Sequence, residues 1–96
     1  MLKVAMKRIV VNVKGRVQGV GYRYFVTDGA QQQDLKGYVR NMPDGSVQVI
    51  AEGSEDSLLE FVRYLHAEGD PVIHVSHLEV EWGIPTGEFS GFGIQR

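Results

Sequence analysis

The sequence predicts an α+β fold in which two helices pack on one face of an antiparallel sheet. Two observations lead to this prediction. Apolar residues alternate with polar ones in several short segments, which is typical of strands with one buried face. Two longer segments repeat their apolar residues every three or four positions, as amphipathic helices do. A chain of 96 residues has room for one modest core, so we expect a single domain over residues 1–96.

The first third of the chain predicts a strand, a turn and a helix. Residues 1–7 are expected to form a flexible leader, and alternation predicts a strand over residues 8–14. A glycine-rich turn follows over residues 15–21. The helix predicted over residues 22–33 contains Gly29, which costs about 1 kcal/mol relative to alanine inside a helix.

The middle of the chain predicts a hairpin followed by the second helix. Strands are expected over residues 36–41 and 46–51, joined by the turn Met42-Pro43-Asp44-Gly45. Proline presets one φ of this turn and glycine accepts a positive one. Ser54 is a suitable N-cap for the second helix, which has the clearest amphipathic pattern in the chain and ends before Gly69.

The last quarter predicts a strand over residues 77–82, a loop over 83–91 and a short strand over 92–94. The complete order is strand, helix, strand, strand, helix, strand, with a fifth short strand. This order is that of the split βαβ, ferredoxin-like arrangement, in which both helices cover the same face of an antiparallel sheet.

The composition excludes several classes of protein. The chain has no cysteine, which excludes a disulfide framework, a cysteine zinc site and a thiol nucleophile. A net charge of −2 gives no overall attraction to nucleic acid or to an anionic membrane. The sequence contains neither an apolar run long enough to span a bilayer nor a signal peptide. We therefore expect a cytoplasmic protein with no membrane or nucleic-acid partner.

The glycine-rich turn is the first candidate functional element. A turn from a strand into a helix gathers unpaired N–H groups at the positive end of the helix, which favours an anion. The backbone amides expected to bind it belong to Gly15, Arg16, Val17, Gln18, Gly19 and Val20. Gly19 is expected to have no room for a Cβ and to adopt a positive φ. Arg23 adds a guanidinium whose fork matches two phosphate oxygens.

Known phosphate motifs do not explain this turn. A P-loop requires Gly-Lys before Ser or Thr, and the chain has no Gly-Lys pair. The dinucleotide fingerprint requires a third glycine where Tyr24 stands. On these residues alone, the glycines could simply form a tight turn with Arg23 as a surface cation.

Three blocks of sequence resemble the acylphosphatase family. The run Gly15-Arg-Val-Gln-Gly-Val-Gly-Tyr-Arg23 resembles the family's first signature. The run Gly37-Tyr-Val-Arg-Asn41, followed by Gly45-Ser46-Val47 and Gly53, resembles the second. The resemblance extends to Gly87-Glu-Phe-Ser-Gly-Phe92 and so covers nearly the whole chain.

The resemblance implies hydrolysis of acyl phosphates to a carboxylate and inorganic phosphate. In this family Arg23 would bind the phosphate and Asn41 would position the attacking water, and both are the expected catalytic residues. No metal and no cofactor is needed. The implied partners are a small acyl phosphate substrate and a phosphate or sulfate anion in the loop. We expect a monomer.

Other charged residues are assigned lesser roles. Lys14, Arg16, Lys36 and Arg40 are expected to add positive charge around the proposed phosphate site. His66, His74 and His77 do not have a zinc-binding spacing and are not expected to be catalytic. Asp44 is expected to serve the turn, and Glu79, Glu81 and Glu88 to be solvated.

The sequence departs from the family where the first helix ends. Family members usually have a Leu-Gly-Leu-like segment where this chain has Gln33-Asp34-Leu35. Asp34 replaces a glycine suited to a left-handed C-cap, so the stability of this helix end is in question.

Two other functions remain as alternatives. One is a module that binds phosphate or carbamoyl phosphate, like the acylphosphatase-like domain of hydrogenase-maturation carbamoyltransferases. That domain belongs to a much longer protein with zinc-finger-like cysteines. The other is a ferredoxin-like nucleic-acid binder, which would need aromatic-rich strands and a basic charge balance.

Overall fold

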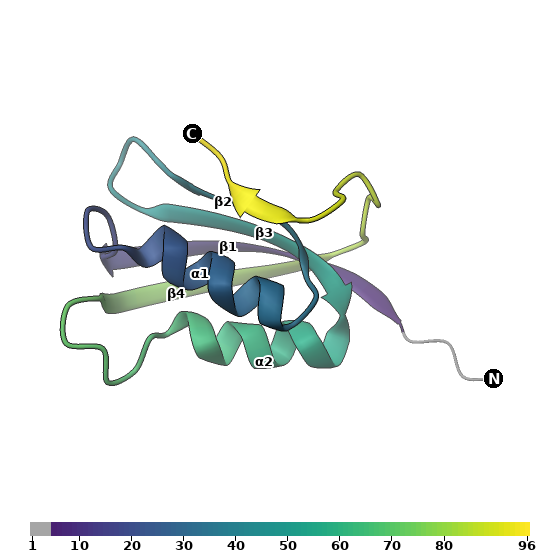
Figure 1. Cartoon of the computed structure of the whole chain (residues 1–96), viewed down its shortest axis with the longest axis horizontal. Coiled ribbons are helices and arrows are strands. Elements are labelled where there is room, and N and C mark those ends of the chain that lie inside the picture. Colours follow the sequence, from purple (N-terminus) through teal and green to yellow (C-terminus); the bar gives the residue numbers. More distant parts are fainter. Residues whose placement is uncertain (1–4) are drawn as a thin grey trace.

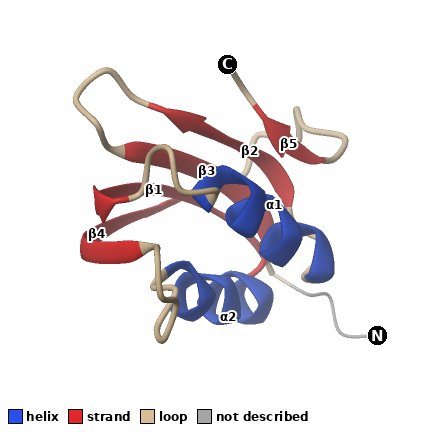
Figure 2. Ribbon diagram, turned by 60° about the vertical axis from the view of Figure 1, so that its left-hand side comes forward, coloured by secondary structure: helices blue, strands red, loops and turns tan. Residues whose placement is uncertain are grey.

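The structure, a computed structural model, describes residues 5–96 and arranges them in two layers. A five-stranded sheet forms one layer, and both helices lie on the same face of it (Figure 1 and Figure 2). The elements in chain order are β1 (Met6–Arg16), α1 (Tyr22–Gln32), β2 (Lys36–Asn41), β3 (Val47–Ser54), α2 (Glu55–Leu65), β4 (His74–Gly83) and β5 (Phe92–Ile94). This order confirms the predicted ferredoxin-like arrangement, including the short fifth strand.

The strand order across the sheet is β4-β1-β3-β2-β5. The long strands β1, β2, β3 and β4 pair antiparallel, as predicted. The short β5 pairs parallel to β2, so the sheet is mixed at this edge. Because β1 and β2 both run antiparallel to β3, their C-terminal ends lie at the same end of the sheet.

The central strands extend further than the sequence indicates. β1 begins at Met6 and β3 ends at Ser54, and these two residues pair with each other. The leader predicted over residues 1–7 is therefore too long, because cross-strand pairing orders its last two residues. Residues 1–4 of that segment lie outside the described residues.

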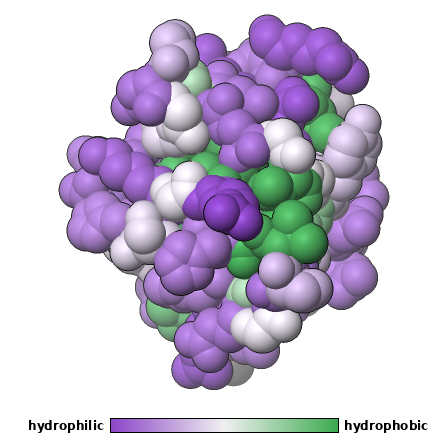
Figure 3. Space-filling model, turned by 90° about the vertical axis from the view of Figure 1, so that its left-hand side faces the viewer, coloured by the Kyte–Doolittle hydropathy of each residue, from purple (hydrophilic) through white to green (hydrophobic). Residues whose placement is uncertain are grey.

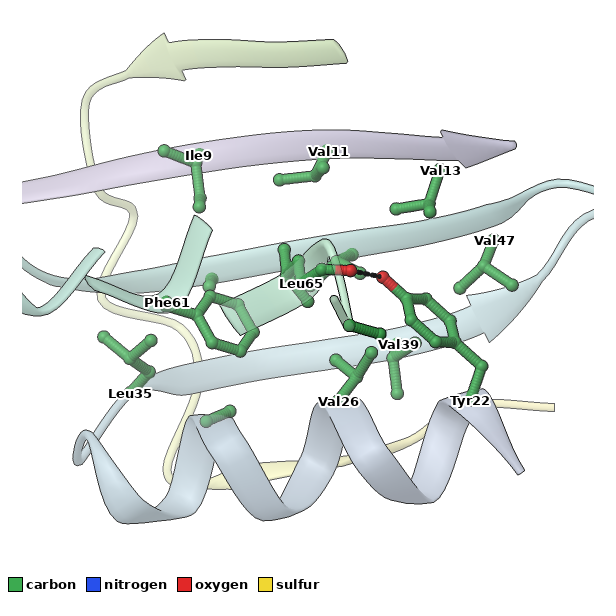
Figure 4. Packing of buried hydrophobic residues seen from close by; sticks show 14 of the residues in the cluster. Ile9, Val11, Val13, Tyr22, Val26, Leu35, Val39, Val47, Phe61 and Leu65 are labelled. Atoms are coloured by element: carbon green, nitrogen blue, oxygen red, sulfur yellow. Dashed lines mark hydrogen bonds between the residues drawn. The ribbon is translucent and has the colours of Figure 1, made fainter. Parts of the chain in front are cut away.

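The core lies between the sheet and the two helices. Valines from β1, β2 and β3 form one buried cluster there with Phe61 and Leu65 of α2 (Figure 4). The buried Tyr22 hydroxyl donates a 2.6 Å hydrogen bond to the carbonyl oxygen of Leu65, drawn in the same view. Burial raises the pKa of the Tyr22 phenol, and the nearby Tyr64 raises it further. The phenol therefore remains a donor, and it joins the start of α1 to the end of α2.

Gly29 permits close contact between the two helices. A Cβ on Gly29 would collide with the ring of Tyr64, and Gly29 is buried. The Tyr64 hydroxyl donates to the Phe25 carbonyl oxygen at 2.7 Å, and its ring stacks on Phe25 with centroids 4.1 Å apart. The sequence-based view of Gly29 as only a weakness of the helix is therefore wrong, because its small size makes room for this aromatic contact.

Asp34 takes the left-handed position that the sequence analysis questioned. Its φ is 56°, and the helix ends in a Schellman motif around it. The Leu35 N–H donates to the Ala30 carbonyl at 2.9 Å, and the Asp34 N–H to the Gln31 carbonyl at 3.2 Å. The Schellman motif therefore forms although aspartate, and not glycine, occupies its left-handed position.

The second helix begins as predicted and ends earlier. The Ser54 hydroxyl oxygen accepts the Ser57 N–H at 3.2 Å, which confirms the N-cap, and Glu55 and Asp56 fill the first turn. The helix ends at Leu65, before the breaker residues that begin at Gly69.

The long connection from β4 to β5 is attached to the sheet through Glu52. This β3 carboxylate is only 5% exposed and accepts a hydrogen bond from Arg8 of β1 at 2.6 Å. It also accepts the Thr86 N–H at 2.9 Å and the Gly87 N–H at 3.0 Å. Burial opposes ionisation, but the Thr86 amide, Arg8 and the Gly87 amide together lower the Glu52 pKa to about 2. The sequence analysis did not identify this residue.

Candidate active site

The candidate site lies where β1 and β2 end. Asn41, the last residue of β2, pairs with Val47, and Val47 pairs with Val13 of β1. The connection from β1 to α1 and the hairpin turn from β2 to β3 therefore leave the sheet at the same end, which is the left-hand end of Figure 1. The predicted blocks that contain Arg23 and Asn41 meet at this end.

The loop from Val17 to Gly21 turns the chain from β1 into α1. The Val17 side chain is 1% exposed and Val20 packs against the core, so the loop is anchored from within. Gly19 and Gly21 have φ values of 75° and 82°. Gly21 is the N-cap of α1 and provides no side-chain cap, so the first-turn amides depend on another acceptor. A helix N-terminus with such unpaired amides favours an anion.

The sequence predicted two properties of Gly19, a positive φ and no room for a Cβ, and only the first is correct. Its φ is positive, as expected, but a Cβ there would have no heavy atom within 4 Å. The constraint is therefore one of backbone conformation and not of space.

Gly15 and Arg16 belong to β1, where they pair with Val75 and His74 of β4 after a bulge. A Cβ on Gly15 would collide with the His74 carbonyl oxygen, so this glycine permits close strand contact. The predicted amide donors thus divide into a strand end at residues 15–16 and a loop at residues 17–20.

The side chain of Gln18 connects the loop to the hairpin turn. Its Nε2 donates to the Met42 and Ser46 carbonyl oxygens, at 2.8 Å each. The sequence analysis assigned Gln18 only a backbone role. The signal that could have identified the side chain was its position in the loop signature. These two hydrogen bonds hold the loop beside the residue that follows Asn41.

The hairpin turn has the structure predicted for it. The Met42 N–H donates to the Ser46 carbonyl at 2.8 Å, and Gly45 has a φ of 92°. Asp44 accepts the Ser46 hydroxyl at 2.6 Å and the Ser46 N–H at 2.9 Å. These bonds, the hydroxyl first, lower the pKa of the exposed Asp44, and Lys14 adds to the effect. Asp44 is a turn residue, as expected.

Asn41 has an unpaired oxygen. The residue lies two positions after the fully buried Val39 in β2, so its side chain points to the same, helix-covered face of the sheet. Its Oδ1 is buried and has no hydrogen-bond partner among residues 5–96. A buried amide oxygen without a partner costs about 1–3 kcal/mol, so a ligand that donates to it is strongly favoured.

Arg23 is the second residue of α1 and is half-buried. It lines a cavity of about 220 Å³ together with loop and helix residues, namely Val17, Gly19, Gly21, Tyr22 and Tyr24. Within the described part of the chain, its guanidinium takes part in no ion pair. A cation at the start of a helix lacks the dipole stabilisation that an anion would have there, which favours a bound anion as its partner.

A larger cavity lies elsewhere. Its volume is about 720 Å³, and Phe25, Tyr64 and the segment from residue 66 to 71 line it. None of the predicted site residues lies on its wall, so size alone would mislead the search for the site.

Two of the four additional basic residues lie away from the loop. Lys36 pairs with Glu52, at the start of β2 and the opposite end from Asn41. Arg40 donates to Gln48 at 2.9 Å on the helix-free face. The expectation that Lys36 and Arg40 surround the phosphate site is wrong, because strand direction and alternation place them elsewhere. Lys14 and Arg16, both exposed, lie at the end of β1 beside the loop.

The three histidines lie outside the loop and the hairpin turn. His66 is the C-cap of α2, while His74 and His77 are exposed on β4. Among residues 5–96, no three histidine or acidic side chains gather in a way that could hold a metal ion. No helix in the described range is long and apolar enough to cross a membrane.

Comparisons with known proteins agree with this geometry. The sequence model of a family described as Acylphosphatase matches residues 9–94. An acylphosphatase of Thermus thermophilus is 45% identical over 93% of this chain and 99% of its own length. This chain belongs to the acylphosphatase family. The family's known reaction is hydrolysis of acyl phosphates, so the chain is a hydrolase of this class.

Solved structures with the same fold include an acylphosphatase and part of a longer protein. A crystal structure of acylphosphatase from Bacillus subtilis has a TM-score of 0.88 and 37% identity, and the match covers 94% of this chain and 99% of that one. T. kodakarensis HypF has a TM-score of 0.80 at 30% identity, over 94% of this chain but 12% of that chain. The same fold therefore occurs also as a small part of a longer protein.

Proposed function

We propose that the enzyme hydrolyses acyl phosphates without a metal ion, with Arg23 and Asn41 as its catalytic residues. The amides of residues 15–20 and the Arg23 guanidinium hold the phosphoryl group. Asn41 holds the attacking water through its Oδ1. The observation that supports this assignment best is the buried, unpaired Oδ1 of Asn41 at the end of the sheet where the loop begins.

The reaction needs few chemical groups from the protein. The water oxygen forms a new P–O bond, the bond from phosphorus to the acyl oxygen breaks, and the carboxylate leaves. A carboxylic acid has a pKa of about 4, so the carboxylate departs without a proton from a general acid. The water's proton passes to a phosphate oxygen. Positioning and charge stabilisation supply most of the acceleration in such a transfer.

The amide of Asn41 suits the role of water positioning. Its oxygen accepts a hydrogen bond from the water and so directs a lone pair of the water oxygen toward phosphorus. Gln18 holds the adjacent turn through the Met42 carbonyl oxygen, which keeps this end of β2 in place beside the loop. The end of β2 therefore orients the water, and the loop orients the phosphoryl group. The Gln18 side chain connects these two elements.

The proposal includes expectations on the location, the oligomeric state and the anion binding of the enzyme. The enzyme is expected to be cytoplasmic and monomeric, and to bind inorganic phosphate or sulfate in the loop. The alternative of a carbamoyl phosphate-binding module shares the fold with HypF. Turnover of an acyl phosphate by the isolated chain favours the hydrolase.

The test is release of phosphate from benzoyl phosphate in excess EDTA, with p-nitrophenyl phosphate as the comparison. We expect rapid hydrolysis of the acyl phosphate and much slower hydrolysis of the monoester, because the monoester's leaving group is a poorer one and no acid assists it. Activity that disappears with the chelator and returns with magnesium would contradict the proposal.

A further inference from the structure

We propose that Tyr24 forms the binding surface for the acyl group and favours acyl phosphates with an aromatic acyl group. This inference rests on the proposed function and extends it from the phosphate to the rest of the substrate. Tyr24 lines the same cavity as Arg23. Tyr24 is 64% exposed, so its ring is accessible to a ligand in this cavity.

The in-line geometry of the reaction places the acyl group on the side of the phosphate where Tyr24 lies. In phosphoryl transfer the attacking and leaving oxygens lie roughly in line through phosphorus. Asn41, at the end of β2, would hold the water on the sheet side of the phosphate. The leaving carboxylate must then face away from the sheet, toward the first turn of α1. Tyr24 occupies that turn, and helical side chains lean toward the N-terminus, here toward the loop.

Tyr24 is free for this role, and its aromatic neighbours are not. Tyr22 is 1% exposed and its hydroxyl is bound to Leu65. Phe25 is stacked on Tyr64. Tyr24 has no stacking partner and no side-chain hydrogen bond among residues 5–96. It therefore presents an unused aromatic face beside the reacting group.

One end of the molecule carries both apolar and hydrophilic surface. Figure 3 faces the end of the molecule where the loop lies, and it shows apolar surface near the centre beside strongly hydrophilic surface. An aromatic acyl phosphate has the same division, with a dianionic head and an apolar body. Offset stacking of its ring on Tyr24 would use the exposed face without a change in the phosphate contacts.

The experiment compares benzoyl phosphate with acetyl phosphate in EDTA, for wild type, Tyr24→Ala, Tyr24→Phe and Asp28→Ala. Asp28 lies one helical turn beyond Tyr24 on the same helix and is exposed, so it controls for a general effect on α1. Each variant is compared with wild type on the same substrate, which removes the different intrinsic reactivities of the two acyl groups.

We expect Tyr24→Ala to lower kcat/KM about three- to tenfold for benzoyl phosphate and less than twofold for acetyl phosphate, as loss of one aromatic contact implies. Tyr24→Phe and Asp28→Ala should match wild type, and inhibition by inorganic phosphate should be the same in all four proteins. Equal losses on both substrates, or a Tyr24→Phe variant as impaired as the alanine variant, would overturn the inference. Absence of hydrolysis of either substrate by wild type would instead refute the proposed function.

Discussion

At the scale of single residues, backbone conformation matters more than space at Gly19 of the proposed phosphate loop. Gly19 combines a φ of 75° with open surroundings. A β-branched residue at positive φ is strongly disfavoured, whereas asparagine is among the residues that tolerate it. We therefore predict that Gly19→Val weakens phosphate binding by at least about tenfold and that Gly19→Asn largely preserves it. Calorimetry with inorganic phosphate measures both affinities. An asparagine variant as weak as the valine variant would show that side-chain size is what matters.

The residue scale is also where sequence reasoning succeeds and fails most clearly. The sequence predicted the turn at Asp44 and the N-cap at Ser54, because both depend on a few neighbouring residues. The close packing of Gly29 on Tyr64 and the bonds of Gln18 to the hairpin turn could not be predicted in this way. They join segments far apart in the chain, and no local preference encodes such contacts.

At the scale of elements, the end of α1 has a Schellman motif but carries Asp34 where glycine is better suited. Asp34 has a positive φ and a negative charge at the C-terminus of a helix, and both are unfavourable. We predict that Asp34→Gly raises the free energy of unfolding by about 0.5–1 kcal/mol, whereas Asp34→Ala lowers it because alanine adopts a positive φ at a greater cost than aspartate does. Urea denaturation of the three proteins provides the measurement. A glycine variant less stable than wild type would show that the aspartate side chain has a stabilising contact.

The elements themselves were predictable where their periodicity was regular. Strand alternation identified β1, β3 and β4, and the apolar face of α2 identified that helix. Their ends were less accurate, as at Met6 and at His74, because cross-strand partners order residues whose own pattern is weak. The same limit explains the error at Lys36, since only the sheet topology shows which end of a strand approaches the site.

At the scale of the whole molecule, Glu52 holds the long β4–β5 connection on the sheet at the end opposite the site. Its pKa, lowered from 4.5 to about 2, means that its ionised form is stabilised by folding. This contribution is complete above pH 4.5 and is lost as the pH falls toward 2. We predict that Glu52→Gln destabilises the protein by about 2–3 kcal/mol at neutral pH, and that the difference from wild type shrinks below pH 4.5.

Denaturation midpoints of wild type and Glu52→Gln between pH 7 and pH 2.5 test this prediction. The exposed Glu81→Gln on β4 serves as the control, and its effect should be within about 0.5 kcal/mol at neutral pH. A difference between wild type and Glu52→Gln that stays constant across the pH range would rule out ionisation of Glu52 as the cause.

The arrangement of the whole molecule also accounts for the two roles in the proposed mechanism. The ends of β1 and β2 meet at one end of the sheet, and each supplies one component of the proposed site: the loop with Arg23, and the amide of Asn41. An interaction with the phosphate exists in both the ground state and the transition state, whereas an interaction with the water matters mainly in the transition state. The two residues should therefore affect binding and turnover differently.

The most direct measurement of this division is phosphate affinity by calorimetry, combined with kcat for benzoyl phosphate, in Asn41→Ala and Arg23→Ala. We predict that Asn41→Ala lowers kcat at least about a hundredfold, as loss of one oriented group in an active site does, and leaves phosphate affinity nearly unchanged. Arg23→Ala should lower both. Loss of phosphate binding in a folded Asn41→Ala protein would mean that Asn41 binds the phosphate and does not position the water.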